Sequence, residues 1–404
     1  MARTIIASTP AHGHVAPLLT IAADLARRGH EVTMLTGSRF AAAVEETGAR
    51  FVALPDAADY DDRNMHLKFA GRAELAPGLA QITYDVNHVF GDPVPAQLEA
   101  LRAILDDFPA ASIIADSLFL GAQALSLSTP RAERPTTIAI GIAPPPVSTD
   151  WDPTIFGDMQ AYLTKVFASV GAELPDFILN SVLSVPDHYL QLTVPGFEYP
   201  RTDALPSFRF IGPLAPRSDP NPEVPHWWTN LRTDRPVVVV TQGTFANVDP
   251  TQLLVPTINA LAGTDVTVVA ATGRGGGADT LRQHLGTVPG NVILADYVSF
   301  DLLLPRASAF ITNGGYGGVH TALRHGVPIV VAGMTEDKPL IAQRVEWSGA
   351  GVNLHTDRPS EAAVRDAVDT LLTQPAYCIR AIALQSEISR YDALSAIAEL
   401  VDAG

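Results

Sequence analysis

The sequence predicts an α/β protein with two Rossmann-like domains, each built on a parallel sheet. Three observations support this prediction. The chain has 404 residues, a length that corresponds to about two domains. In both halves, short runs of β-branched residues alternate with amphipathic helical segments, an order typical of parallel sheets covered by helices. A proline-rich polar stretch, residues 215–235, separates the two halves and has the composition of a linker.

The first half opens with a βαβαβ pattern. Thr4–Ser8 is a buried strand, and the loop Thr9–Pro17 that follows contains two histidines, His12 and His14. Ligands bind at the carboxyl ends of parallel strands, so this loop and Asp116, which follows the strand at 112–115, are candidate site positions. We expect further strands at residues 31–35, 49–54, 136–142, 189–193 and 208–211, and helices at 18–28, 40–46, 95–105 and 118–127.

Between residues 147 and 186 the pattern is looser. Apolar side chains are scattered among polar ones there, and they either line a pocket for a hydrophobic molecule or pack two ordinary helices; the sequence does not separate these alternatives. The residues concerned are Trp151, Phe156, Met159, Tyr162, Phe167, Phe177 and Ile178.

In the second half, three strands are each followed by a glycine-containing loop. The loops are Gly243-Thr244 after Val237–Thr241, Gly273–Gly277 after Val266–Ala271, and Asn313–Gly318 after Phe310–Thr312. A glycine turn that enters a helix presents backbone N–H groups and the positive end of the helix dipole to an anion, usually phosphate. One such turn is equally well explained as structural, but three together indicate a ligand of nucleotide size.

These patterns divide the chain into a first domain, 1–214, the linker, a second domain, 236–380, and a terminal helical segment, 381–404, which we expect to pack back on the first domain. The net charge of −16 argues against nucleic acid or an anionic membrane as partner. Cys378 is the single cysteine, which excludes an intrachain disulfide. No secretory signal pattern and no apolar run of about 18 residues is present, so we expect a cytoplasmic protein without a membrane span.

Two motifs carry a family resemblance. They are A-H-G-H-V-A-P-L-L at residues 11–19, followed by R-G-H-E-V-T at 28–33, and the block Tyr297–Gly351. On these motifs nearly the whole chain resembles the inverting, nucleotide-sugar-dependent glycosyltransferases of the GT-B type. Within the UDP-glycosyltransferase superfamily it is similar to the bacterial enzymes that modify natural products. The resemblance implies that the two Rossmann-like domains face each other across a cleft.

The resemblance also implies roles for individual residues. His14 would be the general base, with Asp116 as its carboxylate partner. The donor would be bound in the second domain, with the nucleotide base stacked on Tyr297, the phosphates at the glycine turns and the sugar hydroxyls near Asp337. The implied donor-binding residues are Gly243, Thr244, Tyr297, Val298, Asn313, Gly315, Gly317, Gly318, Asp337 and Lys338.

Four positions depart from the family pattern. Asn313 stands where histidine is usual, and Gly318 where a serine or threonine is usual. Thr321 replaces a glutamate that holds the ribose hydroxyls, which weakens the ribose site or suits a thymidine nucleotide; His320 is an alternative ribose contact. Lys338 replaces glutamine, so sugar recognition is expected to differ.

Each role also has a structural alternative. His14 could be an ordinary loop histidine, Asp116 could only cap the helix at 118–127, Tyr297 could pack in the core, and Asp337 could be a solvated loop acid. Imidazole is largely unprotonated near neutral pH and is well suited to remove a proton from an attacking hydroxyl. Fixed N–H donors at the glycine turns would meet the charge of the leaving diphosphate, so we expect neither a metal nor another cofactor.

The predicted function is transfer of a sugar from a UDP- or dTDP-sugar to a hydroxyl of a small hydrophobic natural product, aromatic or macrolide-like, with inversion. Two alternatives are a nucleotide-sugar 2-epimerase of the same fold and a non-catalytic auxiliary protein that resembles a glycosyltransferase. The sequence leaves open the identity of the donor, the identity of the acceptor, and whether the protein is a monomer or a homodimer.

Overall fold

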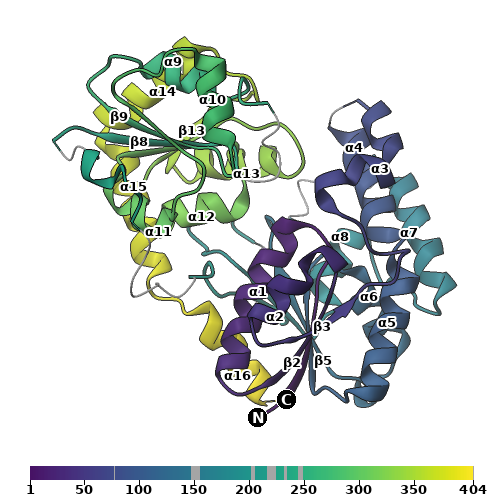
Figure 1. The fold of residues 1–404 in the computed structure, drawn as a ribbon. Helices are drawn as coiled ribbons and strands as arrows, with labels where there is room; N and C mark the ends of the chain where they lie inside the picture. Colours follow the sequence, from purple (N-terminus) through teal and green to yellow (C-terminus); the bar gives the residue numbers. More distant parts are fainter. Residues whose placement is uncertain are drawn as a thin grey trace. The chain divides into compact units, whose positions relative to one another are not determined.

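A computed structural model describes residues 1–76, 78–146, 155–201, 205–215, 224–231, 234–243 and 249–403. The chain forms two compact units (Figure 1). The first contains residues 1–192, 200–214 and the segment that begins at Asp392, and the second contains residues 193–199 and 215–391. Each unit holds one sheet whose strand pairs are all parallel, which confirms the predicted α/β class with two parallel-sheet domains.

The first unit has a seven-stranded sheet in the order β3-β2-β1-β4-β5-β6-β7. Its strands are β1 (Arg3–Ala7), β2 (Glu31–Thr36), β3 (Arg50–Ala53), β4 (Ser112–Asp116), β5 (Thr136–Gly141), β6 (His188–Gln191) and β7 (Phe208–Phe210). The main helices are α1 (His12–Arg27), α2 (Ala41–Glu46), α5 (Val94–Asp107), α6 (Leu120–Ser128), α7 (Gly157–Ser169), α8 (Ile178–Ser184) and α16 (Ala393–Ala403). Between β3 and α5 lie α3 (Met65–Lys68), α4 (Leu79–Tyr84) and a π-helix, η4 (Asp85–Gly91).

Successive residues of these strands enter opposite cores, because side chains alternate between the two faces of a sheet. Ile5 and Ile113 belong to the cluster that packs under α5 to α8. Ile6 and Ile114 belong to the cluster that packs under α1, α2 and α16. Apolar burial on both faces explains why these strands read as continuous apolar runs.

The second unit has a six-stranded sheet in the order β10-β9-β8-β11-β12-β13. Its strands are β8 (Val237–Thr241), β9 (Thr267–Ala271), β10 (Val292–Ala295), β11 (Ala309–Thr312), β12 (Ile329–Val331) and β13 (Gly351–Asn353). Its helices are α9 (Leu254–Leu261), α10 (Gly277–Leu285), α11 (Phe300–Leu303), α12 (Tyr316–Arg324), α13 (Lys338–Trp347), α14 (Glu361–Thr373) and α15 (Pro375–Ile388). One core lies beneath α9 and α14 and the other beneath α12, α13 and α15.

Two segments pack in a different unit from the residues that precede them in the sequence. Thr193–Tyr199, which lies between β6 and β7 of the first sheet, packs in the second unit. After α15 ends in the second unit, α16 packs on α1 of the first, as Figure 1 shows. The Arg28 guanidinium donates to the Ser395 hydroxyl, with an Nη2–Oγ distance of 3.1 Å, and helps fix α16 there.

Two helices start earlier than the sequence predicts. α1 begins at His12 instead of Leu18 and contains Pro17, so His14 lies in the first turn of a helix and not in a loop. α12 begins at Tyr316 instead of Val319, so Gly317 and Gly318 are helical. Proline and glycine disfavour helix interiors, so the sequence analysis placed the start of each helix after its proline or glycines. Packing of Val15 and Val319 in the cores outweighs that local preference.

The described part of the looser region, residues 155–186, is mostly ordinary core. Phe156, Met159, Phe167 and Ile178 are buried in the cluster beneath α5 to α8, and Tyr162 and Phe177 pack against its edge. Packing of helices therefore explains the four buried positions. Trp151 lies outside the described residues.

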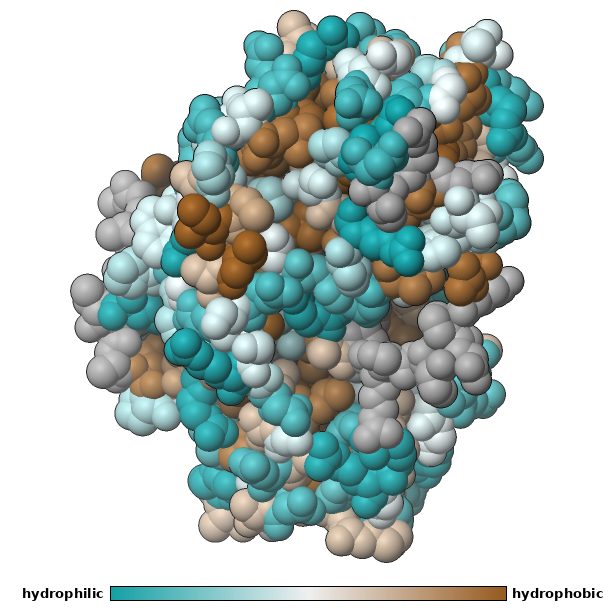
Figure 2. All heavy atoms as spheres, turned by 90° about the vertical axis from the view of Figure 1, so that its left-hand side faces the viewer, coloured by the Kyte–Doolittle hydropathy of each residue, from teal (hydrophilic) through white to brown (hydrophobic). Residues whose placement is uncertain are grey.

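Polar and apolar residues are mixed on the face shown in Figure 2, where brown hydrophobic groups lie among teal hydrophilic ones. Large exposed apolar side chains include Ile379 and Ile382 on α15. No helix in the described parts of the chain has both the length and the apolar character that crossing a membrane requires.

Candidate functional site

Asp116 is the last residue of β4, and its buried carboxylate is held from three directions. Its side chain is 0% exposed. It accepts hydrogen bonds from the backbone N–H of Thr9, at 2.7 Å, and of Leu118, at 2.9 Å. The third contact is the His14 ring. The two backbone donors fix the carboxylate in place, so Asp116 serves both as a local cap and as a partner for histidine.

His14 lies in the first turn of α1, after the strand that neighbours β4 in the sheet. Its Nδ1 is 3.0 Å from Asp116 Oδ1. The ring stacks on Phe90 of the π-helix η4, with centroids 5.6 Å apart, and remains 16% exposed. Because a carboxylate only accepts hydrogen bonds, Nδ1 carries the proton in the neutral ring and Nε2 is left with a lone pair. This arrangement can accept a proton at Nε2 and stabilise the resulting imidazolium.

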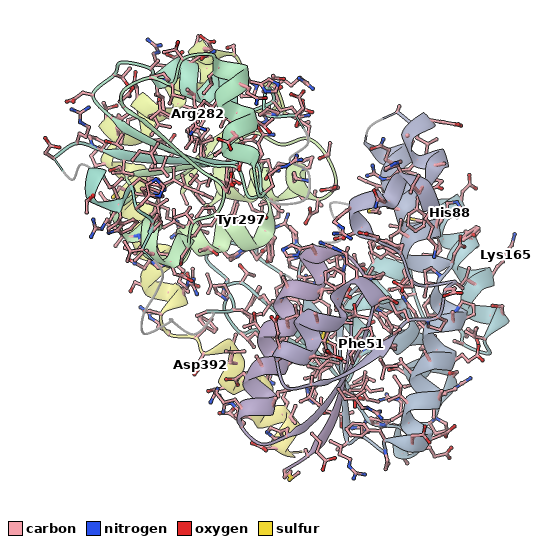
Figure 3. All side chains as sticks on the ribbon, viewed as in Figure 1. Phe51, His88, Lys165, Arg282, Tyr297 and Asp392 are labelled. Carbon is pink, nitrogen blue, oxygen red and sulfur yellow. The ribbon has the colours of Figure 1, made fainter. Side chains whose placement is uncertain are left out.

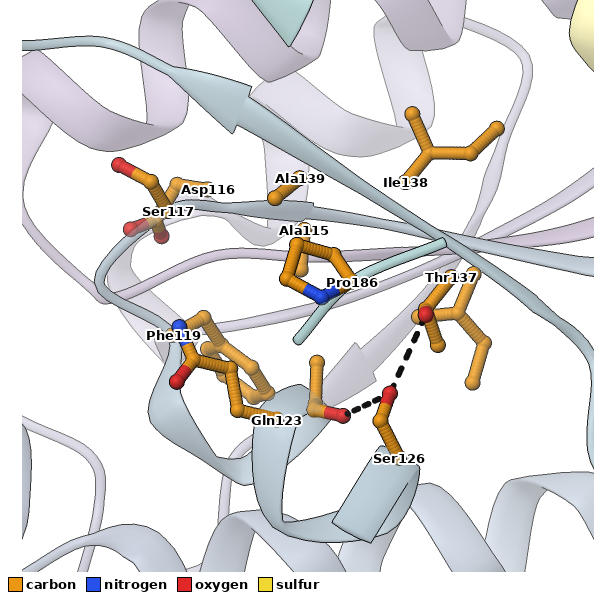
Figure 4. Close-up of a pocket in the computed structure, with 12 residues that line it drawn as sticks. Ala115, Asp116, Ser117, Phe119, Gln123, Ser126, Thr137, Ile138, Ala139 and Pro186 are labelled. Atoms are coloured by element: carbon orange, nitrogen blue, oxygen red, sulfur yellow. Dashed lines mark hydrogen bonds between the residues drawn. The ribbon is translucent and has the colours of Figure 1, made fainter. Parts of the chain in front are cut away.

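A small hollow lies behind Asp116 (Figure 4). Its volume is about 10 Å³, which is room for one water molecule and not for a substrate. Ser126 closes its floor: its Oγ is 3.1 Å from Thr137 Oγ1 and 3.1 Å from the Ala122 carbonyl oxygen, and its single proton can be donated to either. Within the described residues the buried Gln123 Oε1 lacks a hydrogen-bond donor, so the lining suits a structural water.

In the second unit, the turn after β11 has the geometry of an anion site. Gly314 has φ 91°, which favours glycine, and Gly315 is the N-cap of α12. The first intrahelical bond of α12 runs from Val319 N to Gly315 O at 3.0 Å, so the N–H groups of Gly317 and Gly318 precede the helical ladder. Among the described residues, a Cβ added at Gly315, Gly317 or Gly318 would meet nothing within 4 Å, so these residues leave the backbone there open to a ligand.

The structure brings Asn313 and Gly243 together at this sheet edge. Asn313 Nδ2 donates to the Gln242 carbonyl at 2.5 Å, which uses one of its two N–H donors. A Cβ on Gly243, whose φ is 75°, would lie 3.6 Å from Asn313 Oδ1. The predicted partner Thr244 lies outside the described residues.

The glycine loop after β9 does not resemble the turn after β11. The Asp296 carboxylate accepts from Gly276 N at 2.8 Å and from Ala278 N at 2.7 Å. An internal carboxylate therefore already occupies the N-terminus of α10, where the sequence alone suggested part of a nucleotide site. The prediction that all three glycine loops serve one nucleotide is wrong for this loop.

The other predicted donor residues differ in environment. Tyr297 is 65% exposed, which excludes core packing and leaves its ring available for stacking, whereas Val298 packs against the core. Asp337 is the N-cap residue of α13. Lys338 is buried, and its amine contacts Glu336 and donates to Thr335 Oγ1 at 3.3 Å.

A buried polar network beneath α12 has no counterpart in the sequence analysis. Glu198, from the segment Thr193–Tyr199, accepts from the Tyr316 hydroxyl at 2.9 Å and pairs with Arg344 of α13. The side chains of Glu198 and Arg344 are each 1% exposed. Nothing in the sequence pattern links residues so far apart, and the network is visible only once the segment is seen to join the second unit.

His320 belongs to the same network. Its Nδ1 is 2.9 Å from the Tyr316 carbonyl and its Nε2 is 2.6 Å from Thr193 Oγ1. Burial lowers the pKa of His320 to about 4. The ring is 2% exposed, so the alternative in which His320 contacts a ribose is wrong.

Comparisons with known proteins agree with this geometry. Residues 257–399 match the family model described as erythromycin biosynthesis protein CIII-like, C-terminal domain. The chain is 37% identical to UDP-glycosyltransferase 2 of Phaeomoniella chlamydospora, over 98% of this chain and 94% of that protein. It is 38% identical to 4'-demethylrebeccamycin synthase of Lentzea aerocolonigenes, over 99% of both chains.

The chain belongs to the UDP-glycosyltransferase family and is a GT-B glycosyltransferase of the natural-product type. The fold agrees: the crystal structure of CalG4, the calicheamicin glycosyltransferase, superimposes with a TM-score of 0.79 at 24% identity, covering 100% of this chain and 98% of that one. In this glycosyltransferase the described residues contain no group of three or more histidine, cysteine or acidic side chains placed to hold a metal ion.

Proposed function

We propose that this glycosyltransferase moves a sugar from a UDP- or dTDP-sugar to a hydroxyl of a small hydrophobic natural product, with inversion and without a metal. The observation that carries the proposal is the pair formed by His14 and Asp116, whose Nδ1 and Oδ1 are 3.0 Å apart while His14 keeps an exposed edge. The comparisons support the transferase class; the donor, the acceptor, the base and the stereochemistry are our inference.

In the proposed reaction, the acceptor oxygen forms a bond to the anomeric carbon as the bond from that carbon to the diphosphate oxygen breaks. The hydroxyl proton moves to His14 Nε2. Asp116 remains ionised and stabilises the imidazolium, and the electron pair of the broken bond leaves on the nucleoside diphosphate. One displacement of this kind inverts the configuration of the anomeric carbon.

We propose that the nucleotide-sugar donor binds in the second unit. The N–H groups of Gly317 and Gly318 and the positive end of α12 suit the charge of a diphosphate. The exposed Tyr297 supplies a flat surface for a nucleobase. With N–H donors meeting the charge, we propose that no metal ion or other cofactor takes part.

The proposal is tested by incubating the protein with UDP-glucose or dTDP-glucose and a panel of phenols and macrolide aglycones, with mass-spectrometric detection. We expect a glycoside whose anomeric configuration, read by proton NMR, is opposite to that of the donor. Retained configuration would overturn the single displacement. The relative UDP-glycosyltransferase 2 is a transferase by name, which does not favour an epimerase or an auxiliary protein here. An epimerised donor formed without any acceptor would restore the epimerase alternative.

A further inference from the structure

The first unit contains a cavity of about 230 Å³ that the proposed mechanism does not use. Three aromatic side chains and three polar ones line it: Tyr60, Phe69, Tyr84, Lys68, His88 and Asp92. The volume is somewhat smaller than the roughly 300–1,000 Å³ of pockets for drug-sized ligands. The cavity therefore suits an aromatic portion of a ligand better than a complete large molecule.

A second histidine–carboxylate pair faces this cavity. His88 Nδ1 is 2.9 Å from Asp92 Oδ2, and the Tyr162 hydroxyl donates to the other oxygen, Asp92 Oδ1. The hydrogen bond to Asp92 raises the pKa of Tyr162 to about 12, so the phenol stays a donor. The His88 ring also packs against Tyr84 and Tyr162, with centroids 4.5 and 5.4 Å away. Its orientation is thus fixed from both sides.

The fixed orientation determines what His88 can bind. Nδ1 donates to the carboxylate, so in the neutral ring Nε2 is an acceptor. Within the described residues, no hydrogen bond is made by this Nε2. An acceptor at the wall of an aromatic cavity fits a ligand ring that carries an O–H or N–H group.

Tyr60 supplies part of the aromatic wall of this cavity. Its side chain lines the cavity, is 8% exposed, and packs edge-on against Phe69 with centroids 5.2 Å apart. The buried hydroxyl finds no hydrogen-bond partner among the described residues, and such a group is costly to bury unsatisfied. Lys68 differs, since its amine already donates to the carbonyls of Asp56, Ala57 and Asp59.

The cavity is linked to the catalytic pair through η4. This π-helix carries His88 and also Phe90, the residue that stacks on His14, and π-helices occur frequently at functional sites. Burial, and as a smaller cause the negative charge of Asp116, raise the pKa of Tyr60. Figure 3 shows His88 beside the helices that Figure 1 labels α4 and α7.

We propose that this cavity binds an aromatic ring of the acceptor and that His88 Nε2 accepts a hydrogen bond from an O–H or N–H group on that ring. The inference rests on the proposed function and narrows it. The acceptor is an aromatic compound with two polar groups, one that becomes glycosylated and one, remote from it, that His88 recognises. His88 is then a specificity-determining residue.

Two probes of nearly equal size test the proposal: 2,6-dihydroxynaphthalene and 2-naphthol, which lacks the second hydroxyl. Their dissociation constants are measured by probe fluorescence with the protein saturated in UDP. We expect wild type to bind the dihydroxy probe roughly three- to tenfold more tightly, the range that one hydrogen bond accounts for. His88→Phe keeps an aromatic ring and abolishes the preference, His88→Gln retains part of it, and the exposed control His66→Phe retains all of it.

Equal preference in wild type and His88→Phe, or none in wild type, overturns the assignment. The same proteins are assayed for glycoside formation, which separates the two proposals. His14→Ala should lose transfer and keep the His88-dependent preference. If wild type shows the binding preference but forms no glycoside, the cavity assignment stands and the proposed transfer to such phenols is wrong. If wild type forms the glycoside but His88→Phe keeps the same preference, the proposed transfer stands and the cavity assignment is wrong.

Discussion

Replacing Glu198 with glutamine tests the buried network beneath α12. The substitution keeps the shape of the side chain and one acceptor oxygen for Tyr316 but removes the negative charge. Arg344, whose side chain is 1% exposed, then holds its charge in the interior without its carboxylate. Removing one partner of a buried ion pair costs about 3–5 kcal/mol, because the remaining charge has lost both water and its counter-charge.

Differential scanning calorimetry measures this cost as a shift of the transition of the second unit. For a unit of this size each kcal/mol lowers Tm by roughly 2–4 °C, so we expect Glu198→Gln to lower it by about 6–20 °C. A surface pair provides the control. Asp279 pairs with Arg282, and both side chains are more than half exposed, so Asp279→Asn should change Tm by less than about 4 °C.

Adding Arg344→Met to Glu198→Gln tests the direction of the change in stability. Because the double variant removes the buried Arg344 charge together with the Glu198 carboxylate that pairs with it, it should be more stable than Glu198→Gln alone. Two results would refute the reasoning: a Tm for Glu198→Gln as close to wild type as that of the surface control, or a double variant destabilised by the sum of both single substitutions.

Four further predictions concern catalysis, binding and pH. Asp116→Asn should lower kcat by roughly 10²–10⁴-fold, because the wrong tautomer of His14 is favoured, and leave acceptor KM nearly unchanged in steady-state kinetics. Gly318→Ala should lose no stability, since its methyl meets none of the described residues within 4 Å, yet weaken UDP binding in calorimetry; unchanged affinity would exclude a phosphate there. Burial lowers the pKa of His320 to about 4, so its contribution to the free energy of unfolding is fully present above pH 6.5. Up to about 3 kcal/mol of that free energy is lost as the pH falls from 6.5 to 4. In urea unfolding, His320→Gln should remove this part of the pH dependence. Transfer should persist in excess EDTA, and loss that added Mg²⁺ restores would contradict the metal-free proposal.

Much of the fold was readable from the sequence because its strands are buried on both faces. Val237–Thr241 is a continuous apolar run that the structure reproduces as β8. The approach of His14 to Asp116 was also foreseeable, since His14 follows β1 and Asp116 ends β4, and a parallel sheet places these two strands side by side.

The features that were not foreseen depend on contacts between distant segments. The early starts of α1 and α12 run against local propensity and follow from core packing. The glycine loop that precedes α10 looks like a phosphate loop until Asp296 is seen to occupy it. Glu198 could not be assigned from sequence, because its role depends on which unit its segment joins.

Comparing His14→Ala with His12→Ala tests most directly whether His14 removes the acceptor proton. The two histidines are two residues apart, but only His14 makes the hydrogen bond to the Asp116 side chain. With the donor and acceptor found by the screen, we expect His14→Ala to lose at least about 10²-fold in kcat while UDP affinity is unchanged and His12→Ala stays close to wild type. Turnover by His14→Ala equal to that of His12→Ala would contradict the account.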